Sequence, residues 1–194
     1  MAKSNGCATE TVQPYLMTYD ILILNPVSGI SGDRVLSCLA ALGIDESFMN
    51  RVLSETGIGN EVRVRITTEK RRGIQGSRVT FGFTDPVMRT PDEMREKVRT
   101  SGLTDTVKSC ALSVIDALID AEAGVHGSDR RHVRFHELAH PDTIADAVIV
   151  SGALEHLGFV PAKSVEEALS MAMEVHGKSA SIACVQNPPA FNRQ

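Results

Sequence analysis

The chain has 194 residues, 42% of them hydrophobic and 23% charged, which suits a soluble globular protein with one sizeable core. A net charge of −4 and an aromatic content of 4% without Trp argue against nucleic acid, which would need a basic surface and rings for stacking. The four cysteines form no C-x-x-C pair, so the spacing excludes a disulfide scaffold and favours a reducing compartment.

The N-terminal residues carry no targeting pattern. They lack a basic segment followed by an apolar one, and no run in the chain approaches the length of a membrane span. We therefore expect a cytoplasmic protein with no membrane partner, in which residues 1–18 are a disordered lead-in.

The first candidate element is the short apolar run of residues 21–24, which is typical of a strand buried on both faces. It leads into a loop with two glycines and two serines, residues 25–33, and then into a helix that ends at Gly43. A strand, a glycine loop and a helix N-terminus together present backbone N–H groups to a phosphate or carboxylate. The alternative is a tight turn that needs glycine, with Ser31 or Asp33 as the helix cap. The candidate phosphate-binding residues are Ser28, Gly29, Ser31 and Gly32.

A second helix is expected between Asp45 as its cap and Gly57. Apolar residues then alternate with polar ones in two stretches on either side of Arg72-Gly73, which predicts an antiparallel hairpin. The expected fold is α+β, or a layered α/β unit, whose small mixed sheet comes from residues 20–24, 61–67 and 78–84 and is covered by helices.

Residues 85–91, with prolines near both ends, are the expected flexible connection to the helical second half. A short polar helix should cover residues 92–100. Apolar faces predict three further helices and a final strand at residues 181–185. The expected faces are Val107, Ala111, Val114, Leu118, Glu122 and Val125; then Ile144, Val148, Ser151 and Leu154; then Val165, Ala168, Leu169 and Ala172. Cys38 and Cys110 are expected on apolar helical faces.

Residues 133–146 concentrate two imidazoles and three carboxylates. Pro141 suits the first turn of a helix, which places Asp142 and Asp146 on one face, where they repel unless a cation lies between them. With His136 and Glu137 just upstream, the donors would suit nickel, zinc or manganese. The alternative is structural, with Asp142 complementing the helix dipole, Asp146 solvated and His136 in the core.

Three motifs together resemble one family. They are NPVSGISGD at residues 25–33, AEAGVHG at residues 121–127, and FHE at residues 135–137 with DTIAD at residues 142–146 and ALEHLG at residues 153–158. Their order and spacing are similar to those of the nickel insertion protein of lactate racemase maturation (LarC type). That family inserts nickel into a sulfur-bearing pyridinium mononucleotide to form the nickel-pincer cofactor. The resemblance divides the chain into a family-like domain at residues 19–158 and a divergent C-terminal appendage at residues 159–194. A C-terminal portion associated in the family with CTP and a divalent metal has no counterpart here.

The resemblance implies a lyase or chelatase type of activity, with divalent nickel, or alternatively manganese or magnesium, as the metal. The implied partners are the pyridinium mononucleotide and a lactate racemase family apoprotein. Combined with the residue pattern, it assigns the metal-handling side of the site to His136, Glu137, Asp142, Asp146, Asp33 and His126. Three positions depart from the family pattern. This chain has Asn25 where the family usually has Asp, Arg34 where it has Met, and Arg134 where it has the first His of a His-x-His-Glu run.

Two other functions fit the residues. One is a metal-dependent nucleotide or phosphoester hydrolase in which Asp33, Asp142 and Asp146 hold magnesium or manganese. The other is a non-catalytic remnant that retains the core and has lost the chemistry.

Overall fold

The computed structural model describes residues 30–177 of the chain. The expected lead-in, the strands at residues 21–24 and 181–185, and the candidates Ser28 and Gly29 lie outside this range. The described elements, in chain order, are α1 Gly32–Ala41, α2 Glu46–Thr56, β1 Val62–Arg71, β2 Ile74–Phe83, α3 Pro91–Arg99, α4 Asp105–His126, the short 3-10 helices η1 Arg130–His132 and η2 Glu137–Ala139, α5 Pro141–His156 and α6 Val165–His176.

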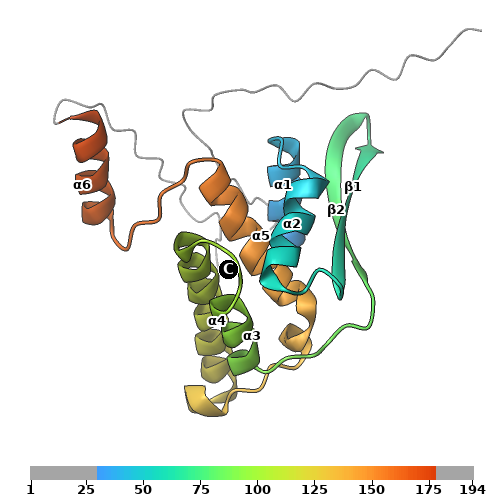
Figure 1. The fold of residues 1–194 in the computed structure, drawn as a ribbon, viewed down its shortest axis with the longest axis vertical. Coiled ribbons are helices and arrows are strands. Elements are labelled where there is room, and N and C mark those ends of the chain that lie inside the picture. The colour runs from blue at the N-terminus through green and yellow to red at the C-terminus, as the bar shows by residue number, and fades with distance from the viewer. Residues whose placement is uncertain (1–29, 178–194) are drawn as a thin grey trace, which may run out of the picture.

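Helix α5 is the centre of the fold. It passes between α3 and α4 on one side and α1, α2 and the hairpin on the other (Figure 1). Ile144, Val148 and Ile149 are fully buried, and Ser151 is nearly so, which confirms most of the expected face. A helix that is apolar on nearly all sides is typical of a central position. Because helices pack against an antiparallel hairpin, the architecture is α+β, as expected.

The two ends of α2 follow from the local sequence. The Asp45 carboxylate accepts a hydrogen bond from the Phe48 N–H at 2.7 Å and so satisfies one of the free donors of α2. Gly57 ends the same helix in the left-handed conformation, with φ of 77°. Both residues were expected in these roles.

The hairpin pairs Val62 with Phe83 and turns at Arg72 and Gly73, as expected. Both strands continue further toward the turn than the predicted ranges, because the backbone ladder extends into residues whose side chains are polar and exposed. Within residues 30–177 the sheet has two strands, and the third strand expected for a mixed sheet falls outside this range.

Side chains from α1 and α2 satisfy the outer edges of the hairpin. The Asn50 amide both donates to and accepts from the Val64 backbone, each at 3.0 Å. On the other edge, the Ser37 hydroxyl accepts a hydrogen bond from the Val79 N–H at 3.1 Å. These contacts cover strand edges that would otherwise present unpaired backbone groups.

Helix α4 buries part of the expected face, because Val107 and Ala111 are buried as predicted and Leu118 packs against the core. Val107, Ala111, Ile115 and Ile119 point into the core. Val114 and Val125 are 45% and 80% exposed, so their assignment to the core face is wrong. The helix has apolar residues on more than one face, and the packing against α5 and α3 selects the buried stripe. The expected apolar environment of Cys38 is also wrong, because Cys38 is exposed, whereas Cys110 is partly buried.

Residues 85–91 are anchored where we expected a flexible connection. The Arg89 N–H donates to the Ala139 carbonyl at 2.9 Å, and its guanidinium binds both carboxylate oxygens of Glu61. The two side chains are only 10% and 16% exposed. Hydrogen bonds from the Arg89 guanidinium hold the pair together and lower the pKa of Glu61.

Helix α6 lies apart from the others in Figure 1. Ser164 caps it by accepting a hydrogen bond from the Glu167 N–H. None of its residues is buried, so the expected face containing Val165 and Leu169 does not enter the core. Among the described residues, no helix has the length and apolar character that crossing a membrane would require.

Candidate functional site

The Asp146 carboxylate lies against the N-terminus of α1. A Cβ atom on Gly32, the first residue of α1, would come within 1.8 Å of its Oδ2 atom. The absence of a side chain at Gly32 therefore makes room for this carboxylate. Its other oxygen, Oδ1, is buried and has no hydrogen-bond partner within residues 30–177.

The surroundings of Asp146 disfavour its negative charge. Burial, followed by the negative charges of Asp142 and Asp33, raises the pKa of Asp146 to about 7. The N-terminus of α1 should favour a carboxylate, but desolvation and the two like charges outweigh it. A cation bound beside these three carboxylates would relieve the repulsion.

Asp33 reaches this cluster from α1. Its carboxylate accepts a hydrogen bond from the Ser31 hydroxyl at 2.5 Å. It also lies close enough to Arg78 on β2 to contribute, after Glu69, to the raised pKa of that guanidinium. The negative charge of Asp33 therefore acts both on Arg78 of the hairpin and on Asp146 of α5.

His140 belongs to the same region, although it was not among the expected metal ligands. It is the N-cap of α5, and its ring meets the Phe83 ring edge to face at 4.3 Å between centroids. Its Nδ1 atom lies 3.3 Å from Asp142 Oδ1, yet it is buried without a hydrogen-bond partner among the described residues. The signal was visible in the sequence, because His140 lies two residues before Asp142.

A second group joins the end of α4 to the segment before η2. The rings of His126 and His136 lie 5.8 Å apart between centroids. The Glu122 carboxylate is 3.1 Å from His126 Nε2, one helical turn earlier. Glu122 was expected only on a helix face, but its spacing of four from His126 marks it as a neighbour.

Five of the six expected metal residues thus fall into two groups, the carboxylates Asp33, Asp142 and Asp146 and the imidazoles His126 and His136. Glu137 is exposed at the start of η2, and the structure shows no hydrogen bond or ion pair for its side chain within the described range. In residues 30–177, no three His, Cys, Asp or Glu side chains converge closely enough to hold a metal ion. The assignment of these residues as ligands stays a prediction.

Two of the four expected phosphate residues can be placed. Ser31 is the N-cap of α1 with an extended backbone, and Gly32 is its first helical residue. Ser31 does not cap the helix with its side chain, because its hydroxyl bonds to Asp33 instead. The Asp146 carboxylate already lies at this helix N-terminus, so a phosphate here would need a cation between the two anions.

Replacing Gly32 with Ala should displace the Asp146 carboxylate. The added methyl group would overlap both Oδ2 and Cγ, at 1.8 and 2.2 Å, so the short aspartate side chain must rotate away. We expect nickel retention by the protein to fall several-fold while the fold is kept. Metal content after dialysis measures this, with Gly76→Ala as the control, since a Cβ at Gly76 meets nothing within 4 Å. Unchanged nickel retention in the Gly32 variant would contradict the prediction.

Sequence comparison relates the chain to known proteins. The family model described as "Nickel insertion protein" matches residues 22–180, so the match continues past Gly158, where we expected the resemblance to end. A pyridinium-3,5-bisthiocarboxylic acid mononucleotide nickel insertion protein from Akkermansia muciniphila is 34% identical over 145 residues, which cover 70% of this chain and 36% of that protein.

Two archaeal relatives give the same result. Proteins described as nickel insertion proteins from Archaeoglobus fulgidus and Methanopyrus kandleri are 36% and 38% identical, and each match covers 71% of this chain. The chain spans about a third of the length of these relatives, 34% and 35% respectively. No solved structure shows a significant match. From the extent of the family match and the identity to these relatives, the chain belongs to the nickel insertion protein family.

Proposed function

We propose that this chain takes part in nickel insertion into a pyridinium-3,5-bisthiocarboxylic acid mononucleotide, the substrate named for its Akkermansia relative. The observation that carries the proposal is the Asp146 carboxylate, whose buried Oδ1 lacks a partner and whose charge is opposed by Asp142 and Asp33. Such a carboxylate is poised to accept a divalent cation.

The arrangement suits a metal that must be released. Nitrogen and carboxylate donors bind nickel, but a closed cage of four ligands would retain it. Here the donors are divided between the carboxylate group and the imidazole pair, and neither group alone encloses an ion. Sulfur atoms of the substrate are softer ligands, so they would draw nickel from the oxygen and nitrogen donors.

The imidazole pair would capture the ion. The two rings lie 5.8 Å apart between centroids, and rotation of these side chains would let both direct a nitrogen at one metal, with Glu122 beside His126 as an oxygen donor. Histidine binds a metal only as the neutral imidazole, so acid should weaken the capture.

The remaining parts of the proposal follow the family. The phosphate of the mononucleotide would lie at the N-terminus of α1, near Ser31 and Gly32, with the metal between it and Asp146. A lyase type of reaction, a cytoplasmic location and delivery to a lactate racemase family apoprotein complete the proposed role. The boundary between a domain at residues 19–158 and an appendage also stays a prediction.

Metal content tests the proposal. Purified protein is dialysed against equimolar nickel, zinc and manganese, and the retained metals are measured by mass spectrometry. We expect selective nickel retention by the wild type and at least a tenfold loss when His136→Ala and Asp142→Ala are combined, because each group of donors then lacks a member. A matched control is His176→Ala with Glu174→Ala on α6, where neither side chain is buried.

The other outcomes are equally informative. Manganese retention together with phosphate release from nucleotides would favour the metal-dependent hydrolase instead. Equal nickel retention by the wild type and the double variant, or none by either, would contradict the assignment of these residues.

A further inference from the structure

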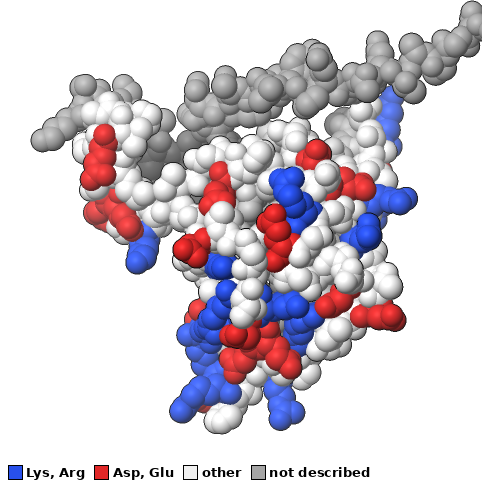
Figure 2. Space-filling model, viewed as in Figure 1, with Lys and Arg blue, Asp and Glu red and all other residues white. Residues whose placement is uncertain are grey.

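A cavity of about 480 Å³, rich in arginine, lies beside the N-terminus of α3, and none of the proposed metal donors lines it. Its wall comes from α3, from α4 and from the segment that includes η1. The polar lining includes Arg95, Arg130, Arg131, His132 and Arg134. Figure 2 shows Lys and Arg side chains gathered at this end of the molecule, with Asp and Glu side chains among them.

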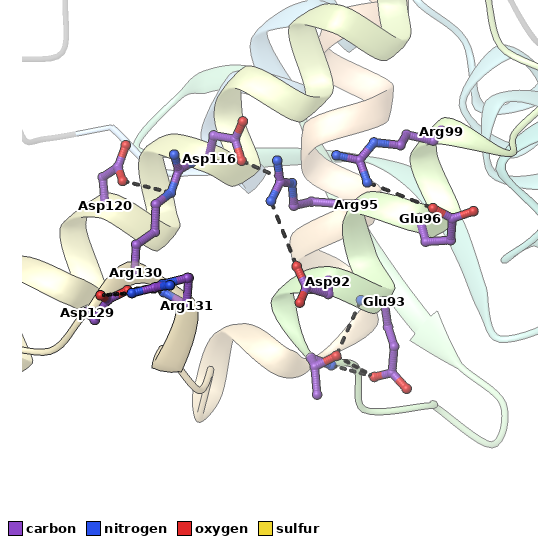
Figure 3. A network of polar contacts seen from close by, with 11 residues as sticks. Asp92, Glu93, Arg95, Glu96, Arg99, Asp116, Asp120, Asp129, Arg130 and Arg131 are labelled. Atoms are coloured by element: carbon purple, nitrogen blue, oxygen red, sulfur yellow. Dashed lines mark hydrogen bonds and ion pairs between the residues drawn. The ribbon is translucent and has the colours of Figure 1, made fainter.

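Ion pairs hold two of these guanidinium groups in place (Figure 3). Arg95 and Arg130 both contact Asp116, at 3.2 and 3.0 Å, and Arg130 also contacts Asp120 at 3.0 Å. A guanidinium carries five N–H donors, so these contacts leave donors for a further acceptor. The carboxylates therefore fix the orientation of the arginines without using up their hydrogen-bonding capacity.

Asp92 also lines the cavity, and its carboxylate lies 3.8 Å from Arg95. Arg134 is the arginine of the lining that has no carboxylate partner among the described residues. It is exposed, and the structure shows no hydrogen bond or ion pair for it within residues 30–177. Arg131, which also lines the cavity, pairs with Asp129 at 2.9 Å. A fixed group of guanidinium forks with one unpaired member suits an anion that binds two or more of them at once, as a phosphate does.

A second cavity of about 470 Å³ adjoins the first, since Thr90 and Arg134 line both. It is mainly apolar, and its lining includes Met88, Phe135 and Ala139. The two cavities together form a groove with a basic half and an apolar half. At the N-terminus of α3, the side chains of Thr90 and Glu93 each accept a hydrogen bond from the other residue's backbone N–H.

We propose that this groove binds a nucleoside monophosphate, with the phosphate among Arg95, Arg131 and Arg134 and the base against Met88 and Phe135. No proposed nickel ligand lines either cavity. The inference therefore goes beyond nickel handling and is tested without metal. Local carboxylates keep the net charge small, so recognition depends on the geometry of the guanidinium forks more than on long-range attraction.

Calorimetric titration of the full chain with inorganic phosphate, adenosine 5′-monophosphate and adenosine measures separately what the basic half and the apolar half of the groove contribute to binding. We expect the monophosphate to bind more tightly than phosphate, because only the monophosphate fills both cavities, and adenosine to bind too weakly to measure. Arg134→Gln should weaken binding of both anions at least tenfold, while Arg134→Lys retains part of the phosphate affinity. Met88→Ser should weaken binding of the monophosphate only.

Arg72→Gln is the matched control, since Arg72 is an exposed arginine at the hairpin turn. It removes the same charge without touching the groove, so affinities should stay at the wild-type value. Because Arg134 is exposed and makes no hydrogen bond or ion pair within residues 30–177, its variant should melt like the wild type. The proposal is overturned if Arg134→Gln binds as the wild type does, if adenosine binds as tightly as its monophosphate, or if the wild type binds none of the three.

Discussion

Replacing Asp146 with Asn is expected to reduce nickel retention at least tenfold and to stabilise the metal-free protein by about 2 kcal/mol at pH 8. The two effects share one cause. The folded protein places a carboxylate where burial and the charges of Asp142 and Asp33 oppose it, so its pKa is raised to about 7. The neutral amide removes the repulsion and with it the attraction for a cation.

The size of the effect follows from linkage. A shift in pKa from 3.8 to about 7 corresponds to about 4 kcal/mol at full strength, and because Asp146 is partly exposed we expect about half of this. The folded state binds the proton more tightly than the unfolded state does. The stabilisation from this proton is thus complete below about pH 4 and is lost as the pH rises through 7. The wild type should lose stability over this range, and the variant should lose less.

Urea denaturation at pH 5 and pH 8, with and without nickel, measures both parts of the prediction. Nickel should stabilise the wild type more than Asp146→Asn at pH 8, since ligand binding to the folded state adds to its stability. Asp105→Asn, at an exposed aspartate in the first turn of α4, serves as the control. If the two variants respond alike to pH and nickel, Asp146 has no special role.

Replacing Arg89 with Gln is expected to cost roughly 3 kcal/mol of folding stability. Arg89 and Glu61 join the connection before α3 to the start of β1, and both side chains are mostly buried. The variant would leave the Glu61 carboxylate shielded from water without its cation. For a chain of this size, roughly 3 kcal/mol lowers the melting temperature by about 6–12 °C.

The pH dependence of this loss has the opposite sign to that of Asp146. The guanidinium of Arg89 lowers the pKa of Glu61, so the pair contributes stability above the ordinary glutamate value and loses it as the pH falls below 4.5. Arg89→Gln and the wild type should therefore converge in stability at low pH. Arg78→Gln is the control, because it breaks an ion pair with Glu69 that is exposed, and such pairs contribute little. Equal melting temperatures for Arg89→Gln and the wild type at pH 7 would contradict the prediction.

Local structure was predictable where neighbouring residues decide it. Asp45 and Gly57 mark the ends of α2 because an acceptor side chain and a left-handed glycine satisfy helix termini in almost any context. The hairpin follows from alternation on either side of Arg72-Gly73. The α+β class follows from combining these elements with the apolar helical faces.

Other features depended on partners far away in the chain. Helix α4 carries apolar residues on more than one of its own faces, so the sequence does not choose among them. Only the packing against other helices decides that Ile115 is buried and Val114 exposed. Residues 85–91 resemble a flexible connection in composition, yet Arg89 finds Glu61 across the hairpin. An ion pair of this kind leaves no periodic signal in the sequence.

The candidate site shows the same division. The sequence by itself determined that Asp142 and Asp146 share one face of a helix, because their spacing of four matches the helical period. Only the tertiary structure decided that Gly32 and Asp33 of α1 meet that face, that Asp146 Oδ1 lacks a partner within residues 30–177, and that the His140 ring meets Phe83 of the hairpin. The reason is physical: burial and the charges of distant segments set the pKa and the metal affinity of a carboxylate, and these depend on how α1 packs against α5.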